Sequence, residues 1–274
     1  MPYSFKSKIR YSEVGSDEKL TIPAAINYMQ DCSSFQSESL GVGLGTLAAA
    51  QRAWWISNWH IRFYEMPRLC DDIITSTWTY DFKGIYAYRN FRIVRCSSEG
   101  ASSYLACPTS DISANEKSIS SIVNGDYTSD LDIPSTLVAE AQSLWFFVNT
   151  STLTPAKPDE RFVTPYLNQR APSIDMPAMP RKIAVVGEGE PRDRLLITSH
   201  FIDTNGHVNN AHYIDIARGV LPSDTCVREL FVQYKKAALM GNVICPIVYR
   251  ADGEYVVRLA DESGADYAVV KVVG

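Results

Sequence analysis

Runs of β-branched and aromatic residues recur along the N-terminal part of the chain, and Pro, Gly, Asp or Ser residues separate them. Such runs are typical of β-strands. A Lys83-Gly84 step between two of them predicts a hairpin turn. The predicted strands cover residues 54–66, 72–82, 85–96 and 101–112, with a further one at 3–14.

Residues 22–39 are predicted to form a helix, because Pro23 falls in its first turn and Gly41 follows its end. The same order of elements returns in the C-terminal third of the chain. There, Asp252-Gly253 is a strong hairpin signal. A strand is predicted at 194–201, a helix at 209–220, and strands at 227–238, 243–251, 253–261 and 266–273.

A short internal match accompanies this repeated order. Residues 64–73 and 234–243 each run from a Tyr to a β-branched residue across the same eight-residue gap. Both segments also have a leucine at the same offset, Leu69 in one and Leu239 in the other. The match and the element order together indicate a duplication.

The stretch between the two repeats, at about residues 125–185, has a different composition. Residues 137–147 predict a short helix, and residues 152–181 hold six prolines, which is typical of an extended linker. We therefore expect an N-terminal domain at 1–124, a linker, and a C-terminal domain at 186–274. The predicted fold class is α+β, with two domains in tandem, each a curled antiparallel sheet around one central helix.

Composition narrows the classes of function. Hydrophobic residues make up 46% of the 274 residues and charged residues 21%, which is typical of a folded globular protein. The net charge of −5 argues against a nucleic-acid-binding protein. We also expect neither a membrane span nor a secretory signal, because no sufficiently long apolar run is present. The six cysteines form no C-x-x-C pair, so we expect a cytoplasmic protein with reduced thiols.

Other familiar chemical motifs are missing from the sequence. It contains no P-loop, no G-x-G-x-x-G and no metal-ligand spacing, so we expect no cofactor and no metal. No G-x-S-x-G motif is present either, which argues against a serine nucleophile. The histidines His60 and His200 are expected to be structural.

One stretch, FIDTNGHVNNAHYIDIA at residues 201–217, concentrates polar groups ahead of a helical pattern. If the lead-in is extended, Asp203, Asn205 and His207 project on one side together. A carboxylate, an amide and an imidazole at the positive end of a helix suit an oxyanion and a proton transfer. The alternative is an ordinary capped helix, for which D-x-N-G is also typical.

The residues from Asp203 to Tyr213 have the pattern D-x-N-x-H-V-N-N-x-x-Y. This pattern resembles the signature of acyl-acyl-carrier-protein thioesterases of the plant and bacterial type. Trp55 and residues 66–78 and 86–93 also resemble the N-terminal half of that family. The resemblance implies two hotdog domains in tandem, each a curled antiparallel sheet around a central helix.

The resemblance also implies roles for individual residues. Asp203, Asn205 and His207 would be the catalytic Asp, Asn and His of the family. The family has a further glutamate in a pattern like Y-x-x-E-x-x-x-G-D, and its plant branch places a cysteine next to it. This chain has Ala237 at the glutamate position and Asn242 at the position of the final aspartate. The departure removes the acid that the resemblance would assign to the activation of water.

In this family the acyl chain lies largely in the N-terminal half, which makes Met29, Trp54 and Trp55 candidates for binding it. An ordinary core role is the alternative for each of them. Because acyl carrier protein is acidic, a basic face is expected to meet it. Possible contributors are Arg89, Arg92, Arg95, Lys235 and Lys236.

The function implied by the resemblance is hydrolysis of the thioester of fatty acyl-acyl carrier protein, which releases free fatty acid. One alternative is a non-catalytic acyl-thioester binder or regulator on the same fold, and another is an acyl-CoA thioesterase. Acyl carrier protein bearing an acyl chain is the expected partner. The resemblance also allows a homodimer of the double-hotdog chain.

Overall fold

The structure is a computed structural model that describes residues 2–96 and 137–274. The chain divides into two compact units, each formed from several segments. The first comprises Met1–Trp54, Tyr64–Ala141 and Phe146–Asp175, and the second Trp55–Phe63, Gln142–Trp145 and Met176–Gly274.

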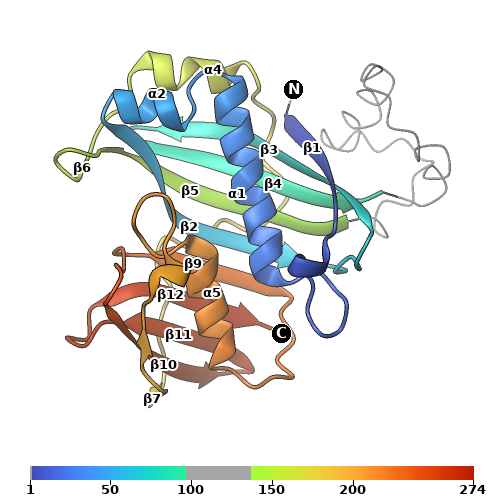
Figure 1. The fold of residues 1–274 in the computed structure, drawn as a ribbon, viewed down its shortest axis with the longest axis vertical. Coiled ribbons are helices and arrows are strands. Elements are labelled where there is room, and N and C mark those ends of the chain that lie inside the picture. Colours follow the sequence, from blue (N-terminus) through green and yellow to red (C-terminus); the bar gives the residue numbers. More distant parts are fainter. Residues whose placement is uncertain (1, 97–136) are drawn as a thin grey trace. The chain divides into compact units, whose positions relative to one another are not determined.

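The first unit is an antiparallel sheet with one long helix, α1 (Ile22–Ser39), lying across it over β3 and β4 (Figure 1). Short elements complete this unit around the helix. The strands lie in the order β1 (Tyr3–Lys8), β3 (Asp72–Lys83), β4 (Tyr86–Arg95) and β5 (Leu137–Asn149). The short elements are the 3-10 turns η1 (Tyr11–Glu13) and η4 (Glu160–Phe162), the helices α2 (Leu44–Ala49) and α4 (Thr164–Leu167), and β6 (Thr154–Pro155).

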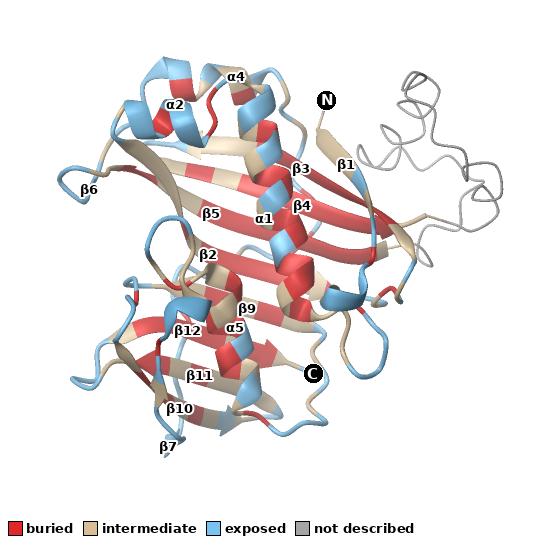
Figure 2. Cartoon of the chain, in the orientation of Figure 1, coloured by how far each residue is buried: buried red, intermediate tan, exposed pale blue. Residues whose placement is uncertain are grey.

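Helix α1 has the bounds that the sequence predicts, because its signals are local. The Thr21 side chain caps the helix by accepting a hydrogen bond from the Ala24 amide at 3.3 Å. At the other end, Gly41 adopts a positive φ of 72°, which glycine tolerates best. Between the ends, Ile26 and Met29 are fully buried, and Figure 2 shows the buried residues along one side of the helix.

The second unit repeats the arrangement. Helix α5 (Asn210–Gly219) lies over β12 and β11 (Figure 1), and the Asn209 side chain caps it by accepting from the Ala211 amide at 2.9 Å. The sheet order is β2 (Arg52–Phe63), β9 (Glu229–Tyr234), β12 (Asp266–Val273), β11 (Glu254–Ala260), β10 (Val243–Ala251) and β7 (Glu190–Pro191), and β8 (Leu195–Leu196) also pairs with β10.

Both predicted hairpins are confirmed. Gly84 has a φ of 64° between β3 and β4, while Asp252 and Gly253 have φ values of 51° and 81° between β10 and β11. Two successive positive φ values match the turn that best suits the twist of paired strands. The two matched segments are also equivalent, since residues 64–73 join β2 to β3 and residues 234–243 join β9 to β10. The structure therefore supports the duplication.

Three sequence predictions do not agree with the structure. The predicted helix at 137–147 is strand β5, where Glu140 accepts a hydrogen bond from Arg92 of β4 at 3.0 Å. The predicted strand at 194–201 is mostly irregular and holds only β8 and the 3-10 turn η5 (Ser199–Phe201). The predicted domain boundary also differs, because the second unit takes in Trp55–Phe63. The predicted strand at 101–112 lies outside the described residues.

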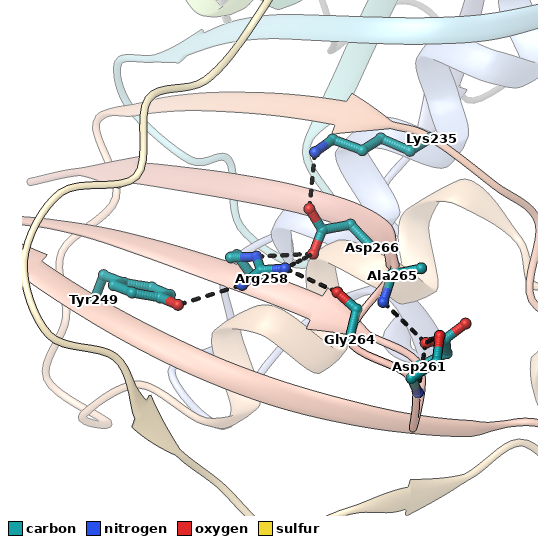
Figure 3. Close-up of polar contacts among 8 residues, drawn as sticks. Lys235, Tyr249, Arg258, Asp261, Gly264, Ala265 and Asp266 are labelled. Atoms are coloured by element: carbon teal, nitrogen blue, oxygen red, sulfur yellow. Dashed lines mark hydrogen bonds and ion pairs between the residues drawn. The ribbon is translucent and has the colours of Figure 1, made fainter.

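A polar network fixes one end of the β11–β12 hairpin in the second unit (Figure 3). The Asp266 carboxylate accepts from Arg258 Nε and from Lys235 Nζ, both at 2.8 Å. Arg258 also donates to the carbonyl oxygen of Gly264 at 3.0 Å. The Asp266 side chain is largely buried, and a buried carboxylate needs charged partners. The network therefore specifies how β9, β11 and β12 meet at this end.

A second buried polar group lies on β2. The His60 side chain is fully buried, stacks on Phe231 and holds its Nε2 atom 2.6 Å from Glu229 Oε1. Arg62 donates to the same carboxylate oxygen at 2.9 Å. Burial lowers the pKa of His60, and the Glu229 hydrogen bond only partly offsets it. Burial alone would raise the pKa of Glu229, but hydrogen bonds from His60 and Arg62 outweigh it, so that this pKa is lowered.

These shifts predict that the free energy of unfolding falls as the pH decreases. A histidine whose pKa is lowered in the folded protein binds a proton more readily in the unfolded chain. Its contribution to the free energy of unfolding is therefore lost as the pH falls below the ordinary histidine pKa of about 6.5. We expect guanidinium unfolding to show a smaller stability loss between pH 7.5 and pH 5 for His60→Gln than for the parent. Equal losses in the two proteins would contradict this assignment.

Candidate active site

The segment ahead of α5 is a tight turn closed by Asp203. One carboxylate oxygen, Oδ1, accepts from the backbone amides of Asn205 at 2.8 Å and His207 at 3.4 Å. The Asp203 amide donates to the His207 carbonyl at 2.8 Å, and Gly206 turns the chain with a φ of 76°. An isolated bridge between Ile202 and Val208 flanks the turn. The lead-in is therefore a turn, and the expected extended segment with three side chains alternating to one side is wrong.

The turn brings two of the three predicted side chains into contact, those of Asp203 and Asn205, while His207 meets Asp203 through its backbone amide. The Asn205 side-chain amide reaches the second carboxylate oxygen of Asp203 at 3.4 Å, and Asn205 is exposed. The half-buried His207 ring lies edge-on to Trp55, with 6.2 Å between the ring centroids. Asp203 thus uses its carboxylate to bind the backbone of the turn, including the amide of His207.

The segment that follows β9 lies against this turn. The Val208 amide donates to the Ala238 carbonyl at 3.0 Å, and the Ala238 amide donates to the Tyr213 hydroxyl at 2.8 Å. Ala237, at the position of the family's glutamate, is exposed directly beside the buried Ala238. The position that would carry the acid therefore precedes a residue that is hydrogen-bonded to the amide after His207, and here it carries only a methyl group. Sequence reasoning did not assign a role to Tyr213, although the motif includes it.

The predicted acyl-chain residues occupy different surroundings. Met29 is fully buried in α1. Trp54 joins an aromatic cluster of the first unit, with ring centroids 4.7 Å from Phe147 and 6.0 Å from Phe82. Trp55, the next residue on β2, lies against His207 in the second unit. Of the three candidates, only Trp55 contacts a predicted catalytic residue of its own unit.

The prediction of a basic face is wrong for Arg89 and Arg92. Arg89 is buried and donates to Gln36 Oε1 at 2.5 Å, while Arg92 is buried and pairs with Glu140. Successive strand residues point to opposite faces of a sheet, so arginines three apart on β4 face opposite ways. The remaining members, Arg95, Lys235 and Lys236, form ion pairs with acidic side chains.

The described residues give no evidence of a metal site or a membrane span. No group of three or more His, Cys, Asp and Glu side chains among them is arranged to hold a metal ion. No helix in the same part of the chain is both long and apolar enough to cross a membrane.

His200 and His212 lie near each other, with 5.4 Å between their ring centroids, and both pack on Phe201.

One family model matches the N-terminal part of the chain. Residues 2–103 match the family model described as the Acyl-ACP thioesterase N-terminal domain, which confirms the resemblance seen in the sequence. Comparison with curated proteins gives no match.

Solved structures of thioesterases share the fold of nearly the whole chain. An acyl-ACP thioesterase from Bacteroides thetaiotaomicron superposes with a TM-score of 0.75 at 18% identity, covering 98% of this chain and 96% of its own. A putative oleoyl thioesterase from Lactobacillus plantarum gives 0.75 at 18% identity, with coverages of 99% and 95%. The 12:0-ACP thioesterase from Umbellularia californica gives 0.71 at 16% identity, with coverages of 99% and 96%. These likenesses confirm the predicted fold class of two hotdog domains in tandem.

The role of Asp203 in closing the turn can be tested without any substrate. An asparagine side chain still offers one carbonyl oxygen to the backbone amides, whereas alanine offers none. We therefore expect Asp203→Ala to raise the amide hydrogen-exchange rates of Asn205 and His207 by about tenfold, the effect of losing a capping interaction. Asp203→Asn is expected to change them much less, and Thr204→Ala serves as a control in the same turn. Equal rates in Asp203→Ala and the parent would contradict the assignment.

Proposed function

We propose that this chain, whose residues 2–103 match the model of the acyl-ACP thioesterase N-terminal domain, hydrolyses the thioester of fatty acyl-acyl carrier protein. The products are free fatty acid and the thiol of the carrier protein. The observation that carries the proposal is the turn closed by Asp203, which presents Asn205 and His207 immediately ahead of α5. The same turn has the sequence pattern of the family.

The reaction asks little of the protein beyond positioning. Water attacks the thioester carbonyl carbon, the carbon–sulfur bond breaks, and the thiolate leaves without needing a proton first. In our proposal, His207 takes the proton from the attacking water, and the Asn205 side chain holds that water or the carbonyl oxygen. Asp203 keeps both residues in place through its hydrogen bonds to the turn.

Because position 237 is an alanine, we expect thioester hydrolysis to be slow. A positioned general base typically contributes about 10²–10⁴-fold to a rate, and a single oxyanion donor about 3 kcal/mol. Loss of one acid beside His207 therefore slows the enzyme, while the groups of the turn retain part of the catalysis. We infer a slow hydrolase, with His207 as its base.

The acyl chain and the carrier protein complete the proposal. The family resemblance assigns the acyl chain largely to the N-terminal half, where Met29 and Trp54 are candidates, with Trp55 beside His207. Acyl carrier protein is the proposed partner. A cytoplasmic location and a homodimer stay predictions.

A panel of thioesters tests the assignment of the turn residues. We expect the parent to release thiol from acyl-carrier-protein thioesters of at least one chain length. His207→Ala is expected to lower kcat by about 10²-fold or more, because the base is removed, and Asn205→Ala by a similar factor. His200→Ala is a matched control, since His200 is an exposed histidine just ahead of the turn.

Three outcomes would decide against parts of the proposal. Parent rates in both His207→Ala and Asn205→Ala would remove these residues from the mechanism. Faster turnover of CoA thioesters than of carrier-protein thioesters would reassign the substrate. Tight binding of acyl thioesters without any turnover would instead support a non-catalytic binder.

Restoring the acid provides an independent prediction. Ala237→Glu places a carboxylate at the exposed position beside Ala238, whose carbonyl binds the amide next to His207. We expect kcat to rise by about tenfold or more as a second group becomes available to activate water. Ala237→Gln is the control, because it has the same shape without the charge. If both variants keep the parent rate, the segment does not lie where the reaction takes place.

A further inference from the structure

The side chain of Tyr213 connects α5 to the segment after β9. Tyr213 is 3% exposed, and its hydroxyl oxygen accepts a hydrogen bond from the Ala238 amide at 2.8 Å. Ala238 is itself fully buried, so this amide has no access to water. A buried amide that loses its acceptor costs about 1–3 kcal/mol, and the hydroxyl is therefore important to the position of the segment.

Ala238 is also hydrogen-bonded to the candidate active site. Its carbonyl oxygen accepts from the Val208 amide at 3.0 Å, and Val208 directly follows His207. Both hydrogen-bonding groups of Ala238 are thus satisfied, one by α5 and one by the turn. Any shift of this residue away from Tyr213 moves the backbone partner of the turn as well.

The Tyr213 ring is itself held from a second side. It packs on Tyr234 with 5.7 Å between ring centroids, and the Tyr234 hydroxyl donates to the Asn210 carbonyl at 2.9 Å. Burial raises the pKa of Tyr213 to about 12. The hydroxyl therefore stays protonated near neutral pH and does not act as a general base.

We propose that Tyr213 is a positioning residue for His207, acting through the two hydrogen bonds of Ala238. This inference rests on the proposed function, because it assigns His207 to the reaction. It adds a third support to the turn, besides the Asp203 carboxylate and the Asn209 cap. It also explains why a residue six positions beyond the histidine belongs to the same short motif.

The test compares Tyr213→Phe with the parent by kinetics and by amide hydrogen exchange. Phenylalanine keeps the ring and removes only the acceptor. We expect the amides of Ala238 and Val208 to exchange about tenfold faster, as expected for a buried hydrogen bond. With a misplaced imidazole, kcat should fall by about 10- to 100-fold while KM stays within about twofold.

Tyr28→Phe is the matched control. Tyr28 is also buried, at 5% exposure, and its hydroxyl donates to Glu13 at 2.7 Å in the first unit. A variant that only loses stability should lower the melting temperature without changing kcat well below that temperature. Tyr28→Phe is expected to behave in this way. A Tyr213→Phe variant with the same behaviour would overturn the proposal.

Failure of this inference is distinguishable from failure of the proposed function. If the parent lacks thioesterase activity, the proposed function fails, yet the exchange of the Val208 amide still tests the connection through Ala238. If His207→Ala is inactive while Tyr213→Phe keeps the parent kcat, only the role of Tyr213 is overturned. If Tyr213→Phe does not fold, amide hydrogen exchange of the parent protein supplies the test. The proposal requires the Ala238 and Val208 amides to exchange through an opening of the same free energy. Different opening free energies for the two amides would overturn the proposal.

Discussion

The geometry of the candidate site depends on one carboxylate, that of Asp203, which binds the backbone of the turn. Asp203 Oδ1 accepts from the amides of Asn205 and His207, and this interaction turns a five-residue segment back on itself ahead of α5. Without it, the side chains at 205 and 207 would follow a flexible loop, and their separation would not be fixed. These bonds pair a side chain with nearby backbone amides outside the helix, in the manner typical of aspartate in turns.

The two units solve the same packing problem with different side chains. In each, one helix covers one face of an antiparallel sheet, and the next strands are joined by equivalent segments at 64–73 and 234–243. The first unit has the longer helix and a cluster of aromatic side chains around Trp54 and Phe147. The second has the shorter helix with the polar turn before it. The two copies therefore differ in their side chains, with an aromatic cluster in the first and a polar turn in the second.

Much of the fold was predictable because its signals are local. Thr21, Pro23 and Gly41 mark the ends of α1, and Asp252-Gly253 specifies a hairpin by its backbone preference alone. Strand β5 was not predictable in this way. Its alanines, glutamate, glutamine and leucines favour a helix, and pairing with distant strands overrides that preference, as the contact between Arg92 and Glu140 illustrates.

The assignment of residues to the candidate site stays a prediction, and the geometry of the turn was not predictable from the sequence. The motif identified Asp203, Asn205 and His207, yet the sequence suggested an extended segment where Asx hydrogen bonds form a turn. The role of Tyr213 depends on a contact with residue 238, which lies 25 residues along the chain. The basic face failed for a related reason, because Arg89 and Arg92 point to opposite faces of one strand and each is buried.

The network around Asp266 has a consequence for how such a protein can change. Lys235 is anchored there by its side chain and, through its backbone amide, to the carbonyl of Tyr267 at 2.8 Å. The sheet is therefore fixed just before position 237, whose side chain is exposed. The side chain at position 237 can therefore be replaced at little cost to folding. Over generations this position is free to change while the hydrogen bonds that hold the neighbouring strands persist.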